Sequence, residues 1–200
     1  EALKKSEELF KNEKFLPAHL SLIRLAIQQS NADEARKLIA AFTKAFPGHP
    51  EALYFDTQLA LADQDIKRAR EGAQQLLRFA PENAQVQQLA GAVEFQAGTL
   101  RLAENHFGKA LQLQPELPAA RRMLAEVHLR AGQPTKALLV LKPLLEQGKA
   151  NAATLAAVAE AHLQNGDMAL AEQFFGRASK SSPDAPQLKL ALALTEAAQG

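Results

Sequence analysis

The sequence predicts an all-α solenoid built from helical hairpins that repeat every 34 residues. Alanine recurs at that interval, and proline follows twelve residues behind most of these alanines. Such a period is typical of stacked helix–turn–helix units, each of which buries its apolar face against its neighbours. The alanines are Ala35, Ala69, Ala103, Ala137 and Ala171, and the prolines are Pro47, Pro81, Pro115 and Pro183.

Five full repeats tile the chain without insertion when each repeat is numbered from 1 to 34. We expect a first helix at positions 2–14 and a second at roughly 17–30 of each repeat, which gives about twelve antiparallel helices. Residues 1–15 are predicted to be the second helix of a preceding repeat, and residues 186–200 the first helix of a sixth. The five repeats are 16–49, 50–83, 84–117, 118–151 and 152–185.

The hairpins are expected to cross closely at repeat positions 8 and 20. Position 20 is the alanine set, and position 8 is small in four repeats of five. Small side chains permit two helix backbones to approach, so we expect both positions to be buried. The residues at position 8 are Ile23, Thr57, Gly91, Ala125 and Ala159.

Turn residues separate the two helices of each repeat. Position 15 is Gly98, Gly132 or Gly166 in the last three repeats, where glycine can take the left-handed conformation that ends a helix. Position 16 then supplies side-chain oxygens that we expect to cap the second helix, namely those of Asn31, Asp65, Thr99 and Asp167.

One proline, Pro143, falls inside a predicted second helix. Proline lacks the amide hydrogen that the carbonyl of Leu139 would accept, and its ring crowds that oxygen. The sequence therefore predicts a kink near this proline or a break that starts a new turn at Leu144. Gly148 is expected to end the helix.

The composition argues against several functions. The chain has 23 Lys and Arg against 22 Asp and Glu, whereas a nucleic-acid-binding protein needs a basic stripe. The absence of cysteine excludes disulfides and thiol nucleophiles. No run of eighteen apolar residues occurs, so we expect no membrane contact by this segment. No catalytic or phosphate-binding motif is present, and we predict neither enzyme activity nor a cofactor.

The repeat resembles the tetratricopeptide repeat, which has a small eighth residue, alanine at position 20, a bulky apolar residue at position 24 and proline at position 32. The resemblance covers 170 of 200 residues. The family's usual tryptophan at position 4 is missing throughout, and His19, Leu53, Gln87, Arg121 and Leu155 stand there. The resemblance implies a right-handed superhelix with a concave groove in which partner peptides lie.

In that family the groove is lined by first-helix positions 2, 5, 9, 12 and 13. Carried onto this chain, those positions give an apolar floor of Leu20, Phe95, Leu129 and Leu163. The polar or aromatic candidates for partner binding are Arg24, Tyr54, Gln58, Gln88, Arg122, Glu126, Arg130, Glu160 and Gln164. The plain alternative is that these are solvated faces of amphipathic helices.

Some family members clamp a terminal carboxylate with lysine at position 5 and asparagine at position 9. Leu20 with Arg24 and Tyr54 with Gln58 occupy those slots here, which argues against a carboxylate clamp. His128 and His162 share position 11, but that position normally carries a buried aromatic in the family. We therefore expect core histidines and no metal site.

A narrower resemblance rests on the amino-acid sequence of two stretches. The stretches LAGAVEFQAGTLRLAENHFGKALQLQPELPAARRMLAEVHLRAGQPTKAL (residues 89–138) and VLKPLLEQ (residues 140–147) resemble the tetratricopeptide lipoproteins of bacterial PEP-CTERM and exopolysaccharide systems. This resemblance implies a location in the bacterial periplasm or cell envelope, with the lipid anchor outside this fragment. The alternative location is the cytoplasm.

These observations favour a non-catalytic scaffold that binds a protein or peptide segment, in the envelope machinery just named. The alternative is a carbohydrate-binding or carbohydrate-modifying accessory domain. That role would need a platform of exposed aromatic residues, yet the chain has one Tyr and no Trp. The terminal helix predicted over 186–199 is apolar on more than one face and is a candidate surface for self-association.

Overall fold

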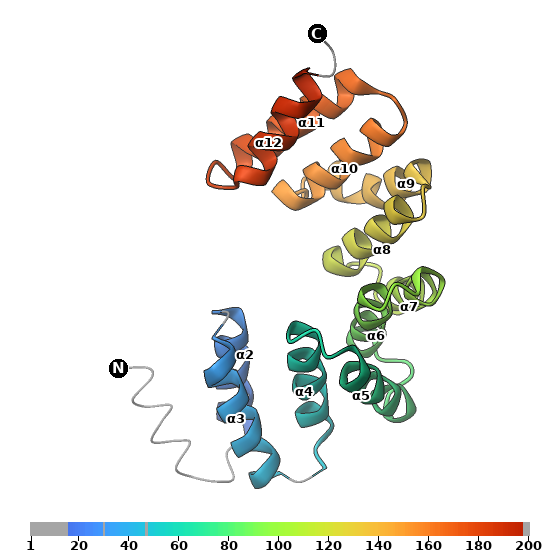
Figure 1. The fold of residues 1–200 in the computed structure, drawn as a ribbon. Helices are drawn as coiled ribbons and strands as arrows, with labels where there is room; N and C mark the ends of the chain where they lie inside the picture. Colours follow the sequence, from blue (N-terminus) through green and yellow to red (C-terminus); the bar gives the residue numbers. More distant parts are fainter. Residues whose placement is uncertain (1–15, 30, 47, 198–200) are drawn as a thin grey trace. The chain divides into compact units, whose positions relative to one another are not determined.

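The computed structural model describes residues 16–29, 31–46 and 48–197, and within them the chain forms eleven helices and no strand. The predicted all-α fold is confirmed, and the helix count is close to the expected twelve. The helix predicted within residues 1–15 lies outside the described residues. The helices are α2 (Leu16–Gln28), α3 (Ala32–Ala45), α4 (Pro50–Ala62), α5 (Ile66–Phe79), α6 (Ala84–Gln96), α7 (Leu100–Leu113), α8 (Pro118–Arg130), α9 (Pro134–Glu146), α10 (Ala152–Gln164), α11 (Met168–Ser181) and α12 (Pro186–Ala197) (Figure 1).

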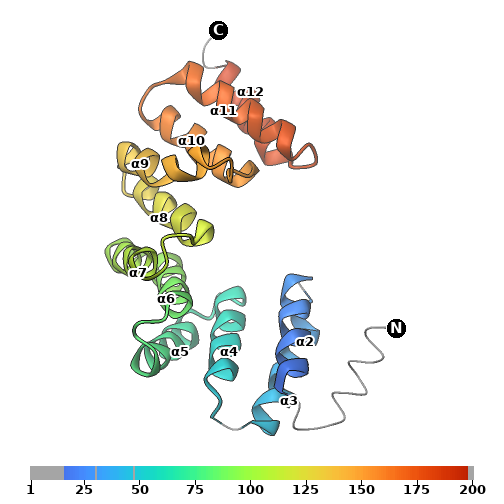
Figure 2. The same ribbon diagram turned by 180° about the vertical axis from the view of Figure 1, so that it is seen from behind.

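The helices belong to two compact units, Glu1–Pro81 and Glu82–Gly200. In the first unit, α2 pairs with α3 and α4 pairs with α5. In the second unit, α6 pairs with α7, α8 with α9 and α10 with α11, and α12 lies beside α11 in both views (Figures 1 and 2). Each pair is one antiparallel hairpin, so the first and second helices of a repeat alternate along the chain as the period predicts.

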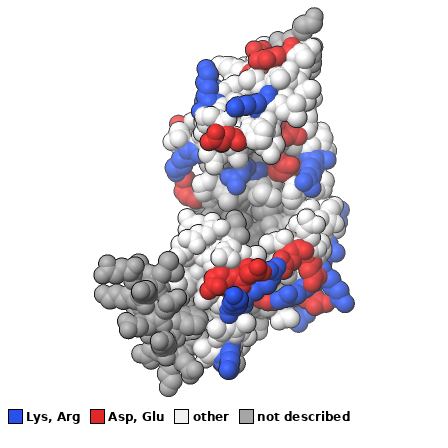
Figure 3. All heavy atoms as spheres, turned by 60° about the vertical axis from the view of Figure 1, so that its left-hand side comes forward, with Lys and Arg blue, Asp and Glu red and all other residues white. Residues whose placement is uncertain are grey.

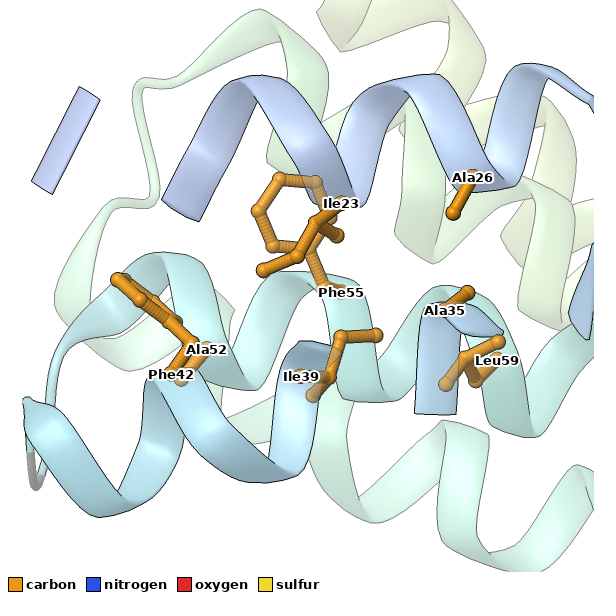
Figure 4. Packing of buried hydrophobic residues seen from close by; sticks show 8 residues of the cluster. All are labelled: Ile23, Ala26, Ala35, Ile39, Phe42, Ala52, Phe55 and Leu59. Atoms are coloured by element: carbon orange, nitrogen blue, oxygen red, sulfur yellow. The ribbon is translucent and has the colours of Figure 1, made fainter. Parts of the chain in front are cut away.

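The core follows the repeat register. All five alanines at position 20 are at most 1% exposed, and the residues at position 8 are buried as well. In the first unit a cluster lies among α2, α3 and α4, with its side chains directed into the space between these helices (Figure 4). Its members are Ile23, Ala26, Ala35, Ile39, Phe42, Ala52, Phe55 and Leu59. The second unit has two further clusters, one containing Phe107 and one containing Leu141.

The turns between helices use the left-handed backbone conformation as expected. Gly98, Gly132 and Gly166 have φ of +77°, +66° and +84°, and a Cβ at any of them would meet no atom within 4 Å. Backbone conformation rather than lack of space therefore explains glycine here. The second repeat differs, since Gln64 takes this conformation with φ of 60°.

Two of the four predicted helix caps are present. The side chains of Asn31 and Asp65 accept hydrogen bonds from the amides of Glu34 and Arg68. Thr99 and Asp167 make no such bond at the start of their helices, so these two predictions are wrong. The Thr99 hydroxyl instead donates to the Glu94 carbonyl oxygen at 2.9 Å, and the Asp167 carboxylate lies 3.3 Å from His162 Nδ1. Both side chains have turned back toward the preceding first helix.

Helix α9 continues through Pro143 to Glu146, so the break expected at Leu144 does not occur. Leu139, whose carbonyl loses its amide donor, is 66% exposed. Water can reach this face of the helix and hydrogen-bond that carbonyl, which explains how the proline is tolerated. Gly148, with φ of +65°, follows the helix as predicted.

Charged side chains of both signs are intermixed on the surface. On the face shown in Figure 3, Lys and Arg lie next to Asp and Glu in each unit. Among the helices that the structure describes, none combines the length and the hydropathy needed to span a bilayer.

Candidate partner-binding surface

The nine predicted partner-binding residues lie on the first helices α2, α4, α6, α8 and α10, and none of them is buried. We call these positions, together with their apolar neighbours at positions 5 and 12, the first-helix surface. Arg24, Arg130, Glu160 and Gln164 are exposed. Tyr54, Gln58, Gln88, Arg122 and Glu126 are partly exposed. All nine are therefore accessible to a partner.

In the first unit, the structure brings Arg24 of α2 close to α4. Its Nη2 lies 3.6 Å from Oε2 of Glu51, which is an ion pair between the exposed Arg24 and the partly buried Glu51. Such pairs contribute little stability. Burial raises the pKa of Tyr54; the charge of Arg24 opposes this and that of Glu51 adds to it. The three side chains thus share one electrostatic environment. Glu51 was not predicted, although it occupies position 2, one of the groove positions of the family.

In the second unit, neighbouring first helices bring a larger group together. The Arg130 guanidinium of α8 lies over the Phe95 ring of α6, with Cζ 3.9 Å from the ring centroid. Arg130 Nε also lies 3.7 Å from Glu126 Oε1. On α10, Gln164 Nε2 donates to Glu160 Oε1 at 3.3 Å. We call Phe95, Glu126, Arg130, Glu160 and Gln164 the acidic cluster.

The two carboxylates of the acidic cluster interact across α8 and α10. Burial raises the pKa of Glu160, and the charge of Glu126 raises it further. The hydrogen bond from Gln164 and the charge of Arg130 oppose this shift. The upward direction means that the ionised form of Glu160 is incompletely compensated in the chain alone.

The predicted residues outside the acidic cluster lie on several first helices. Gln88 and Arg122 lie on α6 and α8, and Gln58 lies on α4 of the first unit. Of the expected apolar floor, Leu20 and Leu163 are partly exposed, whereas Phe95 and Leu129 are 8% and 3% exposed. Because Arg130 covers the Phe95 ring, a partner must displace Arg130 to contact that ring. The sequence pattern did not indicate that Arg130 covers Phe95.

The histidines belong to the packing of the hairpins. His128 is buried, which lowers its pKa, and His162 stacks on Phe174 with ring centroids 5.6 Å apart. Burial also lowers the pKa of His106, whose Nδ1 lies 2.8 Å from Oε1 of the buried Gln87. Over the residues that the structure describes, no three His, Asp or Glu side chains are placed to hold a metal ion.

A surface cavity of about 610 Å³ lies in the first unit among α3, α4 and α5. Its charged lining is largely paired, because Arg36 binds Asp63 and Arg68 binds Asp56. The charges of this cavity are thus mostly used within the fold, and the first-helix surface remains the better candidate site.

Comparison with known proteins decides the family. Models described as tetratricopeptide repeat match residues 20–84, 94–159 and 129–195. The chain belongs to the tetratricopeptide repeat (TPR) family. TPR domains act as scaffolds that bind protein or peptide partners, and the fold is typically non-catalytic. A curated relative, DnaJ homolog subfamily C member 7 homolog of Schizosaccharomyces pombe, is 31% identical over 75 residues. The match spans 38% of this chain and only 16% of that protein.

Solved TPR structures share the fold at low sequence identity. TTC0263 of Thermus thermophilus, a thermophilic TPR protein, is 21% identical with a TM-score of 0.74, over 88% of this chain and 98% of its own. The Cut9–Hcn1 structure gives a TM-score of 0.81 at 18% identity, over 90% of this chain and 36% of that one. YrrB, described as a TPR protein with an unusual peptide-binding site, gives 0.65 at 19% identity, over 98% of each chain.

Proposed function

We propose that this TPR chain is a non-catalytic scaffold that binds a partner peptide along its first-helix surface. The acidic cluster of the second unit carries the proposal. Glu126 and Glu160 interact from neighbouring helices, and Arg130 is the one cation of the cluster set against these two carboxylates, with a hydrogen bond from Gln164 to Glu160. A solved TPR protein, YrrB, is described as having an unusual peptide-binding site and so gives a precedent in kind.

The chemistry of the cluster favours a partner segment with a lysine or arginine. A cation placed between the two carboxylates would relieve their repulsion and form charge-assisted hydrogen bonds, which are about twice as strong as neutral ones. The partly exposed Leu163 at position 12 of α10 would contact an apolar side chain next to that cation. Binding should therefore weaken when the pH falls through the raised pKa of Glu160.

Peptide selection on the intact chain tests this proposal. Peptides chosen from a displayed random library are expected to be enriched in basic residues. Glu160→Gln and Glu126→Gln should each weaken binding by about 5- to 30-fold, the loss of one charge-assisted contact. The control is Glu146→Gln on the second helix α9, whose carboxylate pairs with Lys142 at 3.6 Å and which should bind like the unmodified chain.

A second pair of variants tests the rest of the surface. Arg122→Ala, in the same unit as the acidic cluster, should weaken such a peptide further, and Tyr54→Ala tests separately whether the first unit binds a peptide, in both cases without loss of helix content by circular dichroism. Selected peptides that bind all of these variants as tightly as the unmodified chain would refute the first-helix surface as the site.

We also propose that the scaffold works in the bacterial cell envelope, beside exopolysaccharide and PEP-CTERM machinery. The support is that the amino-acid sequence of residues 89–138 and 140–147 resembles the lipoproteins of those systems. Fractionation of the host cell should find the protein in the envelope, and it should co-purify with export proteins. A cytoplasmic protein, or one that binds the cognate polysaccharide directly and saturably, would contradict this assignment.

A further inference from the structure

Two surface cavities of the first unit adjoin each other and form one groove. The cavity of about 610 Å³ lies among α3, α4 and α5, and a second cavity of about 440 Å³ is lined mainly by the start of α4 and the end of α5. Thr43 and Asp56 line both cavities, so the two meet at these residues. We call the two cavities together the second-helix groove. Each volume is typical of a ligand-binding cleft.

The second-helix groove lies on the side of α4 opposite to the first-helix surface. Asp56 and Leu59 line the groove and are three residues apart, so they share one side of this helix. Tyr54 and Gln58 of the first-helix surface are four residues apart and lie on the other side. A partner in the groove would therefore not compete with one on the first-helix surface, and the inference does not depend on the function proposed for that surface.

The repeat pattern explains why this groove is open. Later repeats place leucine at position 28 and an apolar residue at position 7 of the repeat that follows. These residues are Leu77, Leu111 and Leu145 at position 28, and Ala90, Leu124 and Val158 at position 7. In the second unit, Leu111 packs against the core cluster that contains Leu124. The first repeat has Thr43 at position 28 and the second has Asp56 at position 7, so a polar pair replaces the apolar one.

One cation that lines the second-helix groove has no carboxylate partner. Arg36 pairs with Asp63, and Arg68 pairs with Asp56. Lys44, in the last turn of α3, is exposed, and it is in no ion pair with the residues that the structure describes. Lys44 can therefore bind a carboxylate of a partner without breaking an ion pair of the fold.

An exposed aromatic ring lines the smaller cavity. Phe79, the last residue of α5, is 72% exposed, and among the described residues no large apolar side chain is more exposed. The partly buried Leu53 of α4 lines the same cavity. The repeat does not require an aromatic residue at this place, position 30. The other repeats have Ala45, Leu113, Gln147 and Ser181 there.

We propose that the second-helix groove binds an extended peptide segment with an acidic residue, held by Lys44, and an aromatic residue, packed on Phe79. A ligand that contacts both must pass the junction of the two cavities, which favours an extended peptide over a compact small molecule. The junction suits a peptide backbone. The Thr43 hydroxyl donates to the Ile39 carbonyl oxygen at 2.9 Å, so its own oxygen can accept a hydrogen bond from a peptide amide.

Selection of displayed random peptides on the unmodified chain tests the proposal. One class of selected peptides is expected to combine acidic and aromatic residues. Synthetic, fluorescently labelled members of this class should bind about tenfold or more weakly to Lys44→Glu and to Phe79→Ser, which each lose one contact. A selection that yields no acidic and aromatic class would overturn the proposal.

Two matched variants control for general effects of charge and solubility. Lys67→Glu makes the same charge change on α5 at an exposed residue outside the groove lining. Leu139→Ser removes another exposed apolar side chain, 66% exposed, on α9. Both should bind the acidic and aromatic peptides like the unmodified chain. Controls that weaken binding as much as Lys44→Glu and Phe79→Ser would also overturn the proposal.

Filling the junction tests the location of the peptide. Thr43→Leu gives the first repeat the leucine of the later repeats, and it should weaken this peptide class because the leucine occupies the space where the cavities meet. Glu160→Gln should leave the class unaffected, so a failure of the groove and a failure of the first-helix surface are seen separately. Acidic and aromatic peptides that bind Thr43→Leu as tightly as the unmodified chain would refute the groove as their site.

Discussion

The hairpins α4–α5 of the first unit and α6–α7 of the second both have a close contact at repeat position 8 but place glycine on opposite helices. In α4–α5, glycine is on the second helix, where a Cβ on Gly72 would lie 2.2 Å from Thr57 Oγ1. In α6–α7, glycine is on the first helix, where a Cβ on Gly91 would lie 2.9 Å from carbons of the Phe107 ring. The facing side chains are 1% and 0% exposed, so both crossings are filled.

This difference shows that the repeat specifies a volume between the helices rather than a residue on either one. A hairpin can fill that volume from the first helix with Thr57 or from the second with Phe107, provided that the opposite helix has glycine at the contact. Close packing of protein interiors makes the two choices exclusive. Exchanging residues between the units tests how strictly this holds.

The largest effect is expected for Gly72→Ala. Thr57 is short, and its hydroxyl donates to the Leu53 carbonyl oxygen at 2.7 Å, so it has little room to move away from the new methyl group. Overpacking of this kind costs about 1–3 kcal/mol, which exceeds the gain of up to about 1 kcal/mol from replacing a helical glycine. Chemical denaturation should show the loss in the free energy of unfolding.

Two controls isolate the cause. Gly176→Ala in α11 adds the same methyl group where no atom lies within 4 Å, and it should stabilise the chain by up to about 1 kcal/mol. Adding Thr57→Ala to Gly72→Ala should recover much of the loss, since it removes the nearest atom. A double variant no more stable than Gly72→Ala alone would show that the two residues do not share the crossing.

A smaller loss is expected for Gly91→Ala in the second unit. A Cβ at Gly91 would meet three carbons of the Phe107 ring at 2.9–3.0 Å, and a ring can tilt by a few tenths of an ångström. We expect a net cost of about 1 kcal/mol once the helix propensity of alanine is included. The matched control is Gly108→Ala in α7 of the same hairpin, which faces open space and should be stabilising. Equal effects of both substitutions on thermal unfolding would contradict the close contact.

The turns of the two units allow glutamine and glycine to be exchanged at the left-handed position. Gln64→Gly gives the first unit the residue that the second unit uses, and it should raise the free energy of unfolding by about 0.5 kcal/mol. Relief of left-handed backbone strain, about 1 kcal/mol, is partly offset by the greater freedom of glycine in the unfolded chain. The reverse change, Gly132→Gln, should destabilise by about the same amount. A destabilised Gln64→Gly variant would mean that the glutamine side chain makes a stabilising contact at this turn.

The sequence predicted the register of the fold because the determinants of the register are local. Ala103 at a crossing and Gly98 in a turn are recognisable by type and spacing alone, and the hairpins lie where these residues indicate. The helix caps were less predictable, because a side chain near a helix start has competing partners. Thr99 turned to Glu94 and Asp167 to His162, on the preceding helix in each case.

The candidate site was likewise predictable only in part from the sequence. The repeat register predicted which side chains are accessible, and the structure leaves all nine at least partly exposed. It could not predict that Arg130 covers Phe95, because that contact depends on the distance between α6 and α8. The burial that raises the pKa of Glu160 likewise arises from helix packing and has no signature in residue type.

The smallest effect concerns position 9, where the first unit has Gln58 in α4 and the second has Glu160 in α10. Because the pKa of Glu160 is raised in the folded chain, the folded state holds this proton more tightly than the unfolded state does. Stability from this group is therefore fully present below the unfolded pKa, near pH 4, and is lost as the pH rises through the folded pKa.

Glu160→Gln gives the second unit the neutral residue of the first and should remove that loss. We expect it to leave stability unchanged in acid and to raise it by a few tenths of a kcal/mol at pH 7, since solvent screens the charge of an exposed side chain. Glu116→Gln should do the opposite, because a hydrogen bond from Lys149 holds the pKa of Glu116 below its usual value. Urea denaturation of both variants across this pH range measures the difference. A Glu160→Gln variant less stable than the unmodified chain at pH 7 would show that the carboxylate is already compensated, and would remove the reason to expect a cationic partner there.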